Sequence, residues 1–106
     1  MPADGGEHAL VMALEVADQA SYARYREEMT PLLAEHDGRF VHDFVVATVL
    51  SGARVGVNRV FTIAFPDRSA RERFFADPRY VAVRARWFEP AVRSVETLGR
   101  LVDALR

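Results

Sequence analysis

Alternation of apolar residues with polar or small ones predicts four β-strands in this chain. Their expected ranges are 8–16, 39–50, 57–65 and 93–98. A glycine-containing turn over 51–56 joins the second strand to the third. Along the second strand, Phe40, His42 and Phe44 are expected to share one face, and Asp43 the opposite one. Both faces of this strand are largely apolar, so neither is expected to lie fully in solvent.

Apolar positions spaced three and four residues apart predict two helices. The first is expected to begin after Asp18, which is a typical N-terminal cap, and to end at Gly38. Pro31 lies inside this pattern. We expect the helix to kink or restart there, because proline has no backbone N–H to donate.

The second helix carries two start signals. Ser69 followed three residues later by Glu72 is the pattern of a capping box that opens a helix. Asp77 and Pro78 predict a restart, with the aspartate as the cap and the proline in the first turn. After the last strand, a short amphipathic tail helix is expected over 99–106.

The order strand–helix–strand–strand–helix–strand predicts an α+β fold of the ferredoxin-like βαββαβ type. In this arrangement two helices lie on one face of a four-stranded antiparallel sheet. We expect one such domain over 8–98, preceded by a flexible leader over 1–7. Two helices cover only one face of the sheet, so the apolar residues of the other face require a partner. A second copy of the sheet is the simplest partner, which predicts a homodimer.

Composition narrows the classes of partner. The 106-residue chain has a formal net charge of −1 and no cysteine. The balanced charge does not favour nucleic acid, and the lack of cysteine excludes disulfides, thiolate catalysis and zinc–thiolate sites. No apolar run approaches the ~20 residues that a membrane span requires. The start of the chain lacks the pattern of a signal peptide, so we expect a cytoplasmic protein.

The sequence shows no pattern that would hold a cofactor. The three histidines, His8, His36 and His42, are too dispersed to match the spacing of a metal site. The sequence also contains no glycine-rich phosphate loop, nucleotide fingerprint or nucleophile elbow. We therefore predict that neither a metal nor an organic cofactor is required.

His42 and Asp43 are the candidate catalytic residues. Neighbouring residues of a strand point to opposite faces, so these two cannot form a dyad within one chain. His42 suits a general base near neutral pH, or alternatively a structural hydrogen bond. Asp43 needs a partner if it is buried, and Arg59 on the next strand is the natural one. Arg59 either forms a structural ion pair or binds an anionic group of a ligand.

Aromatic residues and one arginine on the helices are the candidate binding residues. Tyr80, Arg84 and Trp87 fall on one helical stripe, where the arginine would bind a carboxylate or an enolate. Alternatively, Arg84 extends past core aromatics to reach solvent. Tyr22 and Tyr25, near the start of the first helix, would line the mouth of a pocket or simply pack in the core.

Several of these residues also carry a family resemblance. The matching positions are Tyr22, Tyr25, Pro31, Gly38, Arg39, Phe40, Gly52, Arg59, Phe65, Pro66, Tyr80 and Arg84. Their order and spacing resemble the DUF1330 family of the dimeric α+β barrel superfamily, over roughly residues 8 to 98. The resemblance implies a ferredoxin-like fold similar to that of small cofactor-independent monooxygenases. It implies a fold and a pocket rather than a defined reaction.

Three functional hypotheses remain open at this point. The first is a small-molecule-binding domain of unassigned activity, with an anionic or aromatic ligand between the helices and the sheet. The second is a cofactor-independent monooxygenase, isomerase or cyclase acting on an aromatic or polyketide-like acid. There His42, Asp43 or a tyrosine would move protons, and Arg59 or Arg84 would stabilise negative charge. The third is a structural or regulatory dimer without a ligand.

Overall fold

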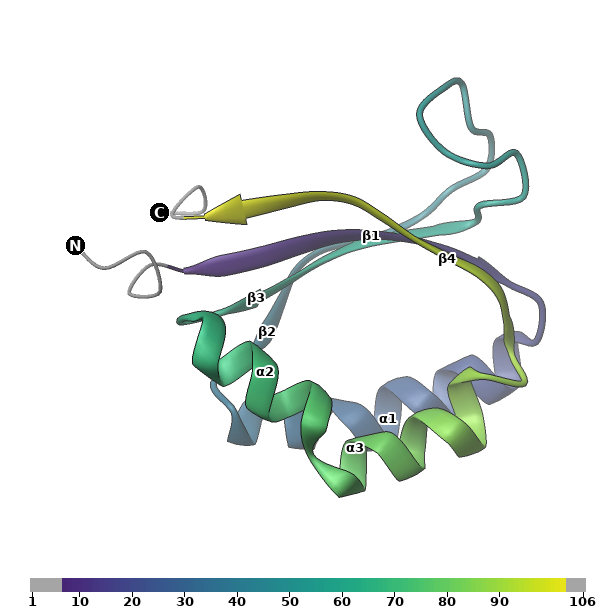
Figure 1. Ribbon diagram of the computed structural model, residues 1–106. Coiled ribbons are helices and arrows are strands. Elements are labelled where there is room, and N and C mark those ends of the chain that lie inside the picture. The colour runs from purple at the N-terminus through teal and green to yellow at the C-terminus, as the bar shows by residue number, and fades with distance from the viewer. Residues whose placement is uncertain (1–6, 103–106) are drawn as a thin grey trace.

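One four-stranded antiparallel sheet carries all the helices on one of its faces (Figure 1). This computed structural model describes residues 7–102. The elements in chain order are β1 (His8–Val16), α1 (Gln19–Glu35), β2 (Arg39–Val45), β3 (Arg59–Phe65), α2 (Arg68–Ala76), α3 (Pro78–Val83), the π-helical turn η1 (Arg84–Phe88) and β4 (Val92–Val102). The strand order is β2-β3-β1-β4. The predicted ferredoxin-like arrangement is confirmed, with the second helical region divided into α2, α3 and η1.

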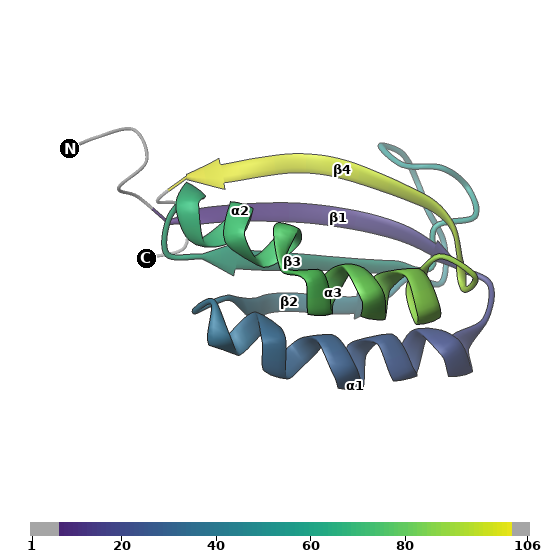
Figure 2. The same ribbon diagram turned by 60° about the horizontal axis from the view of Figure 1, so that its bottom comes forward.

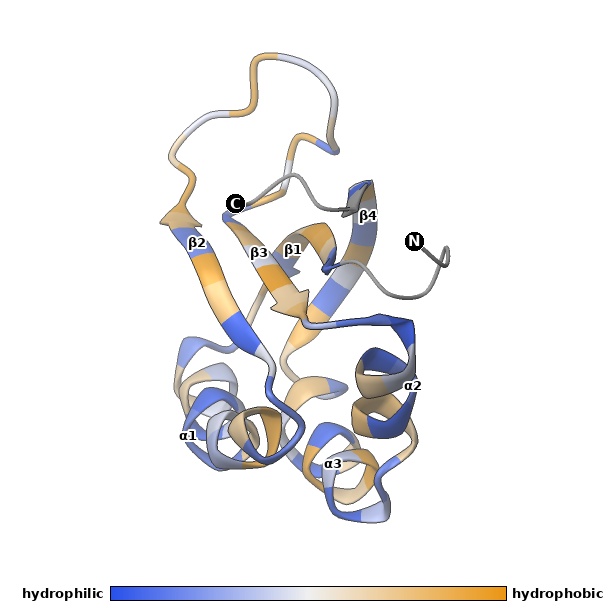
Figure 3. Ribbon diagram, turned by 90° about the vertical axis from the view of Figure 1, so that its left-hand side faces the viewer, coloured by the Kyte–Doolittle hydropathy of each residue, from blue (hydrophilic) through white to orange (hydrophobic). Residues whose placement is uncertain are grey.

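The sheet and the helices form two layers with the core between them (Figures 1 and 2). Figure 3 views these layers end-on and shows apolar segments along β1, β2 and β3. The largest fully buried side chains are Tyr22, Phe65, Phe74, Leu14, Met29 and Leu33. The segment 46–58 extends on the opposite side of the sheet from the helices (Figure 1). Within residues 7–102, no helix is both long enough and apolar enough to cross a lipid bilayer.

A β-bulge in β2 decides which of its side chains face the helices. Phe40 and His42 pair with consecutive residues of β3 although they are two positions apart, so Val41 is an extra residue in the strand. Phe40 and Asp43 consequently both face the helices, whereas His42 faces the opposite side. The expectation that Phe40 and His42 share a face is therefore wrong, because the extra residue reverses the alternation.

The sheet ends earlier at the β2–β3 connection than the sequence predicts. β2 ends at Val45 rather than near residue 50, and β3 begins two residues later than expected. The backbone N–H of Val46 still donates to the carbonyl of Asn58 at 2.8 Å. The Asn58 side chain then makes the hydrogen bonds that a neighbouring strand would make with Val16. Its amide oxygen accepts from the N–H of Val16 at 2.8 Å, and its amide nitrogen donates to the Val16 carbonyl at 2.9 Å. These are the last hydrogen bonds at this end of the sheet, and the segment that connects β2 to β3 leaves the sheet here.

The start of α1 agrees with the sequence, whereas Pro31 does not interrupt it. A carboxylate oxygen of Asp18 accepts a hydrogen bond from the backbone N–H of Ser21 at 3.0 Å, which confirms the cap. The helix then continues through Pro31, so the predicted restart does not occur. Burial of Met29 and Leu33 in the core holds both sides of the proline in one helix.

The end of α1 depends on two adjacent residues with different roles. Asp37 adopts a left-handed backbone with φ of 60°, and its N–H donates to the Ala34 carbonyl at 3.0 Å. The N–H of Gly38 donates to the Leu33 carbonyl at 2.9 Å, which completes a Schellman motif. Gly38 is needed because of crowding rather than backbone conformation: a Cβ at this position would collide with the side chains of Leu33 and Phe65.

The second helical region starts two residues earlier than its capping-box pattern suggests. Asp67 caps α2 by accepting a hydrogen bond from the backbone N–H three residues later at 2.8 Å, so the predicted box of Ser69 and Glu72 is wrong. A carboxylate is a strong acceptor at this position, and Asp67 is placed directly after β3. The second start signal is confirmed, because Asp77 caps α3 with Pro78 in its first turn.

The last strand is longer than predicted and takes the place of part of the expected tail helix. Residues 99–102 continue β4 along β1, so the helix predicted over 99–106 does not begin there. Pairing with β1 satisfies the backbone groups of this segment, which a short amphipathic helix would otherwise have to satisfy alone. Residues 103–106 of that helix, and residues 1–6 of the predicted leader, lie outside the described part of the chain.

The replacement Asp37→Gly is expected to raise the free energy of unfolding by roughly 0.5–1 kcal/mol, because glycine adopts a positive φ without the Cβ penalty. Urea denaturation measures the change. The neighbouring replacement Gly38→Ala is the contrast, and it should lower the stability through its collision with Leu33 and Phe65. Equal effects of the two replacements would contradict this division of roles.

Candidate functional site

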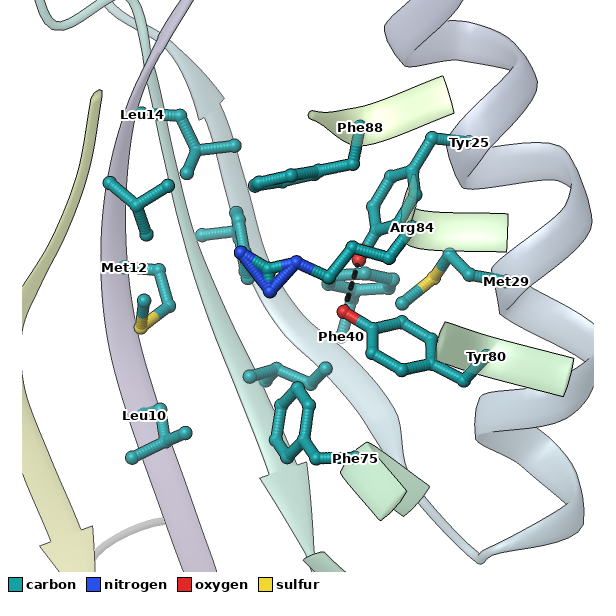
Figure 4. A pocket seen from close by; sticks show the side chains of 13 residues that line it. Leu10, Met12, Leu14, Tyr25, Met29, Phe40, Phe75, Tyr80, Arg84 and Phe88 are labelled. Atoms are coloured by element: carbon teal, nitrogen blue, oxygen red, sulfur yellow. Dashed lines mark hydrogen bonds between the residues drawn. The ribbon is translucent and has the colours of Figure 1, made fainter. Parts of the chain in front are cut away.

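An apolar pocket lies between the sheet and the helices (Figure 4). Its lining residues are Leu10, Met12, Leu14, Tyr25, Met29, Phe40, Phe61, Ile63, Phe75, Tyr80, Arg84, Phe88 and Val95. The cavity volume is about 80 Å³, which is several times the space that one water molecule requires. Ligand pockets more often measure roughly 300–1,000 Å³. The space therefore suits a small ligand, or the inserted end of a larger one.

Arg84 is the only charged side chain among the lining residues, and it extends into the pocket (Figure 4). Its guanidinium carbon lies 4.6 Å from the centre of the Phe88 ring, a favourable cation–π contact. Its Nε is buried and has no hydrogen-bond partner, and no carboxylate of the described residues forms an ion pair with it. Placing a partly buried guanidinium in apolar surroundings without a carboxylate beside it is costly.

Two tyrosines stand beside Arg84 and supply the other polar atoms of the pocket. The hydroxyls of Tyr25 and Tyr80 are hydrogen-bonded to each other at 2.8 Å (Figure 4). Burial raises the pKa of the Tyr25 phenol far above its usual range, and burial also raises the pKa of Tyr80. Both phenols are therefore neutral at neutral pH. The bond between the two hydroxyls uses only one of their two protons, so the other hydroxyl can donate its proton in a hydrogen bond to a ligand.

A π-helical turn determines which aromatic residue joins this group. The N–H of Glu89 donates to the carbonyl of Arg84 at 3.0 Å, a bond that spans five residues rather than four. The wider turn contains one extra residue, so Phe88 takes the place on the pocket side that helical spacing assigns to Trp87. The prediction that Tyr80, Arg84 and Trp87 lie on one inward stripe is therefore correct for the first two and wrong for Trp87.

Trp87 lies outside the pocket and contacts two arginines. The guanidinium carbons of Arg24 and Arg86 lie 4.9 Å and 4.8 Å from its ring centre. Its backbone carbonyl accepts a hydrogen bond from the Ser21 hydroxyl at 2.8 Å, which ties η1 to the start of α1. This environment gives Trp87 a packing role rather than a place in the candidate site.

A second polar cluster joins α1 to the sheet beside the pocket. Arg59 donates two hydrogen bonds to the Asp43 carboxylate, at 2.8 Å and 2.9 Å, and Arg26 donates a third at 2.8 Å. Arg26 also donates to the Tyr22 hydroxyl at 3.0 Å and lies 3.8 Å from the centre of the Phe40 ring. The hydrogen bonds from Arg59 hold the pKa of Asp43 below its usual value, and those from Arg26 act in the same direction.

In this cluster Arg59 has the ion pair that is one of the two arrangements expected from the sequence. Two of its guanidinium nitrogens are engaged by Asp43, so the structural ion pair is the arrangement present. Tyr22 belongs to the same cluster and does not line the pocket, whereas Tyr25 does. Arg26 is absent from the sequence-based set. Its position four residues after Tyr22 on α1 was the only available signal, and many other helix arginines share such a spacing.

His42 lies on the other face of the sheet. Its Nδ1 is hydrogen-bonded to the Thr62 hydroxyl at 3.2 Å, and its ring stacks with Phe44 at a centroid distance of 6.1 Å. His42 and Asp43 therefore point to opposite faces, and neither lines the apolar pocket. Within residues 7–102, no group of three or more histidine and acidic side chains is close enough to hold a metal ion.

Together, fold and pocket define an α+β protein of the ferredoxin-like class with a cavity between its sheet and helices. The profile of the family described as "Domain of unknown function (DUF1330)" matches residues 9–96. The chain belongs to this family, which confirms the resemblance seen in the sequence. A comparison with curated proteins found no match.

Solved structures share this fold at low sequence identity. A protein of unknown function from Rhodopseudomonas palustris is 20% identical, with a TM-score of 0.78, and the match covers 93% of this chain and 84% of that one. A dabb family protein with a ferredoxin-like fold from Mesorhizobium loti is 16% identical, with a TM-score of 0.61 and coverages of 92% and 94%. SnoaB, a cofactor-independent oxygenase from Streptomyces nogalater, is 20% identical, with a TM-score of 0.60 and coverages of 93% and 92%.

The Asp43 cluster predicts a specific response to acid. The pKa of Asp43 is lower in the folded protein than the value near 3.9 of an unfolded chain, so its ionised form stabilises the fold above that pH. This contribution is lost as the pH falls through the lower, folded-state pKa. Asp43→Asn should therefore reduce the free energy of unfolding at neutral pH by roughly 1–3 kcal/mol. Its stability should then fall less steeply than that of the wild type below about pH 4.

Denaturant titrations at several pH values measure both effects. The control is Glu28→Gln, which removes a surface ion pair between Arg24 and Glu28 on α1. That replacement should change stability by no more than about 0.5 kcal/mol. Parallel stability–pH curves for the Asp43→Asn variant and the wild type would show that the cluster is not coupled to folding.

Proposed function

We propose that this protein binds a small apolar or aromatic molecule that carries an anionic group. The observation that carries the proposal is Arg84, a guanidinium inside an apolar pocket with no carboxylate of residues 7–102 paired with it. In this proposal, the ring or chain of the ligand contacts the apolar lining. Its carboxylate or enolate oxygen meets Arg84, which provides a charge-assisted hydrogen bond in a site of low polarity.

The neighbouring tyrosines support the same proposal. Tyr25 and Tyr80 are both neutral at neutral pH, so they add a hydrogen-bond donor without adding negative charge. One free hydroxyl donor and one cation around an apolar space favour an anion over a neutral molecule of the same shape. The small volume of the cavity limits the inserted part of the ligand to about one ring.

A second candidate function is cofactor-independent catalysis on such an acid. The specific observation in its favour is that Arg84 and the two tyrosines form a preorganised group able to stabilise a developing oxyanion. The lining residues include no carboxylate and no imidazole. In this candidate the substrate must therefore lose its proton to a group outside the lining, to water, or to a tyrosine that has first been deprotonated. Ligand binding requires none of these steps and is the simpler proposal.

We also propose that the working form is a homodimer joined through the sheet face that carries no helices. Phe44 on that face is 55% exposed, and Leu50 and Val55 in the 46–58 segment are 94% and 93% exposed. This segment and the sheet together line an apolar recess that includes Val60 and Leu98. Apolar groups gathered on one side of the molecule favour association with a second copy, which would bury both sets at once.

The ligand proposal predicts selective recognition of anions by Arg84. Benzoate should bind measurably more tightly than neutral benzamide, which has nearly the same shape. Arg84→Lys keeps the charge but loses the planar fork and the stacking on Phe88, so benzoate affinity should fall by roughly 10- to 100-fold. Titration followed by NMR measures the affinities, and Arg86→Lys on the outer side of the same turn is the matched control.

Two outcomes would contradict this prediction. In the first, benzoate and benzamide bind the wild type equally well. In the second, Arg84→Lys lowers the melting temperature strongly and leaves benzoate affinity unchanged, which would make Arg84 a structural residue only.

The dimer proposal predicts that the protein sediments as a dimer at micromolar concentration. Phe44→Asp should shift it to a monomer, because it removes apolar burial and places a charge in the interface. Val81→Asp is the matched control, since Val81 is 52% exposed on the helical side of the molecule. A wild-type monomer at that concentration, or a dimer that Phe44→Asp leaves intact, would overturn the proposal.

A further inference from the structure

β1 begins and β4 ends at the same end of the molecule, beside α2 (Figure 2). A basic recess lies at this end. It is lined by His8, Arg68, Arg71, Glu72 and Arg100. None of these residues belongs to the apolar pocket or to the Asp43 cluster. Arg71 and Arg100 outnumber Glu72, the single carboxylate among the described lining residues, in a chain whose formal net charge is −1. The recess is therefore a local concentration of positive charge.

His8 is a second, independent sign of a binding site. Its side chain is 8% exposed and lines the recess, and its Nε2 is buried without a hydrogen-bond partner. Buried polar atoms in native proteins are nearly always hydrogen-bonded to protein, water or a bound group. A ring nitrogen that carries its proton at Nε2 would donate to an anion held by the arginines. This arrangement gives the unsatisfied atom a partner that residues 7–102 do not provide.

We propose that this recess binds a phosphate-type oxyanion. Arg71 on α2 and Arg100 on β4 approach it from the helical layer and from the sheet, and His8 adds a ring N–H donor from β1. Donors that come from three different elements match a tetrahedral anion, which accepts hydrogen bonds in several directions, better than a planar carboxylate. Arg68 also lines the recess, at the first position of α2, where the helix dipole favours negative charge.

Glu72 sets a limit on which ligands the recess accepts. It is the only carboxylate among the described lining residues, so it repels an anion that comes close to it and attracts the neighbouring guanidinium groups. A doubly charged phosphate gains more from the arginines than a singly charged anion does, and is better able to overcome this repulsion. The recess should therefore prefer phosphate to chloride or acetate.

The recess is adjacent to the apolar pocket along two elements. Leu10 of the pocket follows His8 by two residues on the same face of β1, and Phe75 of the pocket follows Glu72 by three residues on α2. The phosphate therefore comes either from free inorganic phosphate or from a phosphate ester whose apolar part enters the pocket. Both sources present the same oxyanion to the recess, and they differ only in what is attached to it.

Calorimetric titration with inorganic phosphate at constant ionic strength tests the proposal. The wild type should bind phosphate saturably, and more tightly than acetate. Arg71→Gln and Arg100→Gln should each weaken phosphate binding by about tenfold or more, as expected when one charge-assisted hydrogen bond is lost. Arg73→Gln on α2 and Arg93→Gln on β4 are the matched controls outside the recess, and each should stay within about twofold of the wild type. His8→Phe, which keeps the bulk of the ring without a donor, should also weaken binding.

Folding and ligand source are checked separately. Arg71→Lys retains the charge, so partial binding by a folded Arg71→Lys variant supports the site if Arg71→Gln proves unstable. Phenyl phosphate in place of inorganic phosphate identifies the source: tighter binding that Arg84→Lys weakens indicates an ester that reaches the pocket, and equal binding indicates free phosphate. Phosphate binding in the recess does not require Arg84. A failure to bind phosphate would therefore leave the proposal for the apolar pocket unaffected. No saturable phosphate binding, or equal losses in the Arg73→Gln and Arg93→Gln controls, would overturn the proposal.

Discussion

The position of one guanidinium inside the apolar space between two layers organises the centre of this structure. Arg84 is held there by the Phe88 ring on one side, while the hydroxyls of Tyr25 and Tyr80 bond to each other nearby. An arginine in such surroundings is stable only if its neighbours are aromatic or polar and its helix is firmly placed. The π-helical turn that starts at Arg84 meets both needs, because it brings Phe88 to the arginine and keeps Trp87 outside to anchor the helix on α1.

Asp43, a second charged group between the same two layers, is fully engaged in ion pairs, unlike Arg84. Asp43 pairs with both Arg59 and Arg26 at the boundary between α1 and the sheet, so those arginines hold the two layers together. Its side chain remains 30% exposed, and water screens part of the charge. The contrast with Arg84 is informative, because Arg59 and Arg26 share a carboxylate and serve the fold, whereas Arg84 has no ion pair among the described residues and lines the cavity.

The distribution of chemistry over the molecule follows from the two-layer architecture. The space between the layers is apolar in its middle, with Arg84 as the polar point, and basic at the end where β1 begins. The free face of the sheet carries apolar groups and His42. A ligand site, an anion site and a surface for a second copy can therefore coexist on about a hundred residues, because each uses a different side of the same sheet or a different end of the same gap.

The sequence by itself determined the order of the strands, the fold class, the helix caps at Asp18 and Asp77, and the joint placement of Tyr80 and Arg84. These features depend on hydrophobic periodicity and on hydrogen bonds between residues close in the chain, so a short stretch of sequence is enough to predict them. Only the tertiary structure decided the bulge at Val41, the exchange of Trp87 for Phe88, and the meeting of distant residues such as His8 in the basic recess. One extra residue in a strand or a helical turn reverses or rotates every side chain that follows, and its place is set by pairing and packing across the fold.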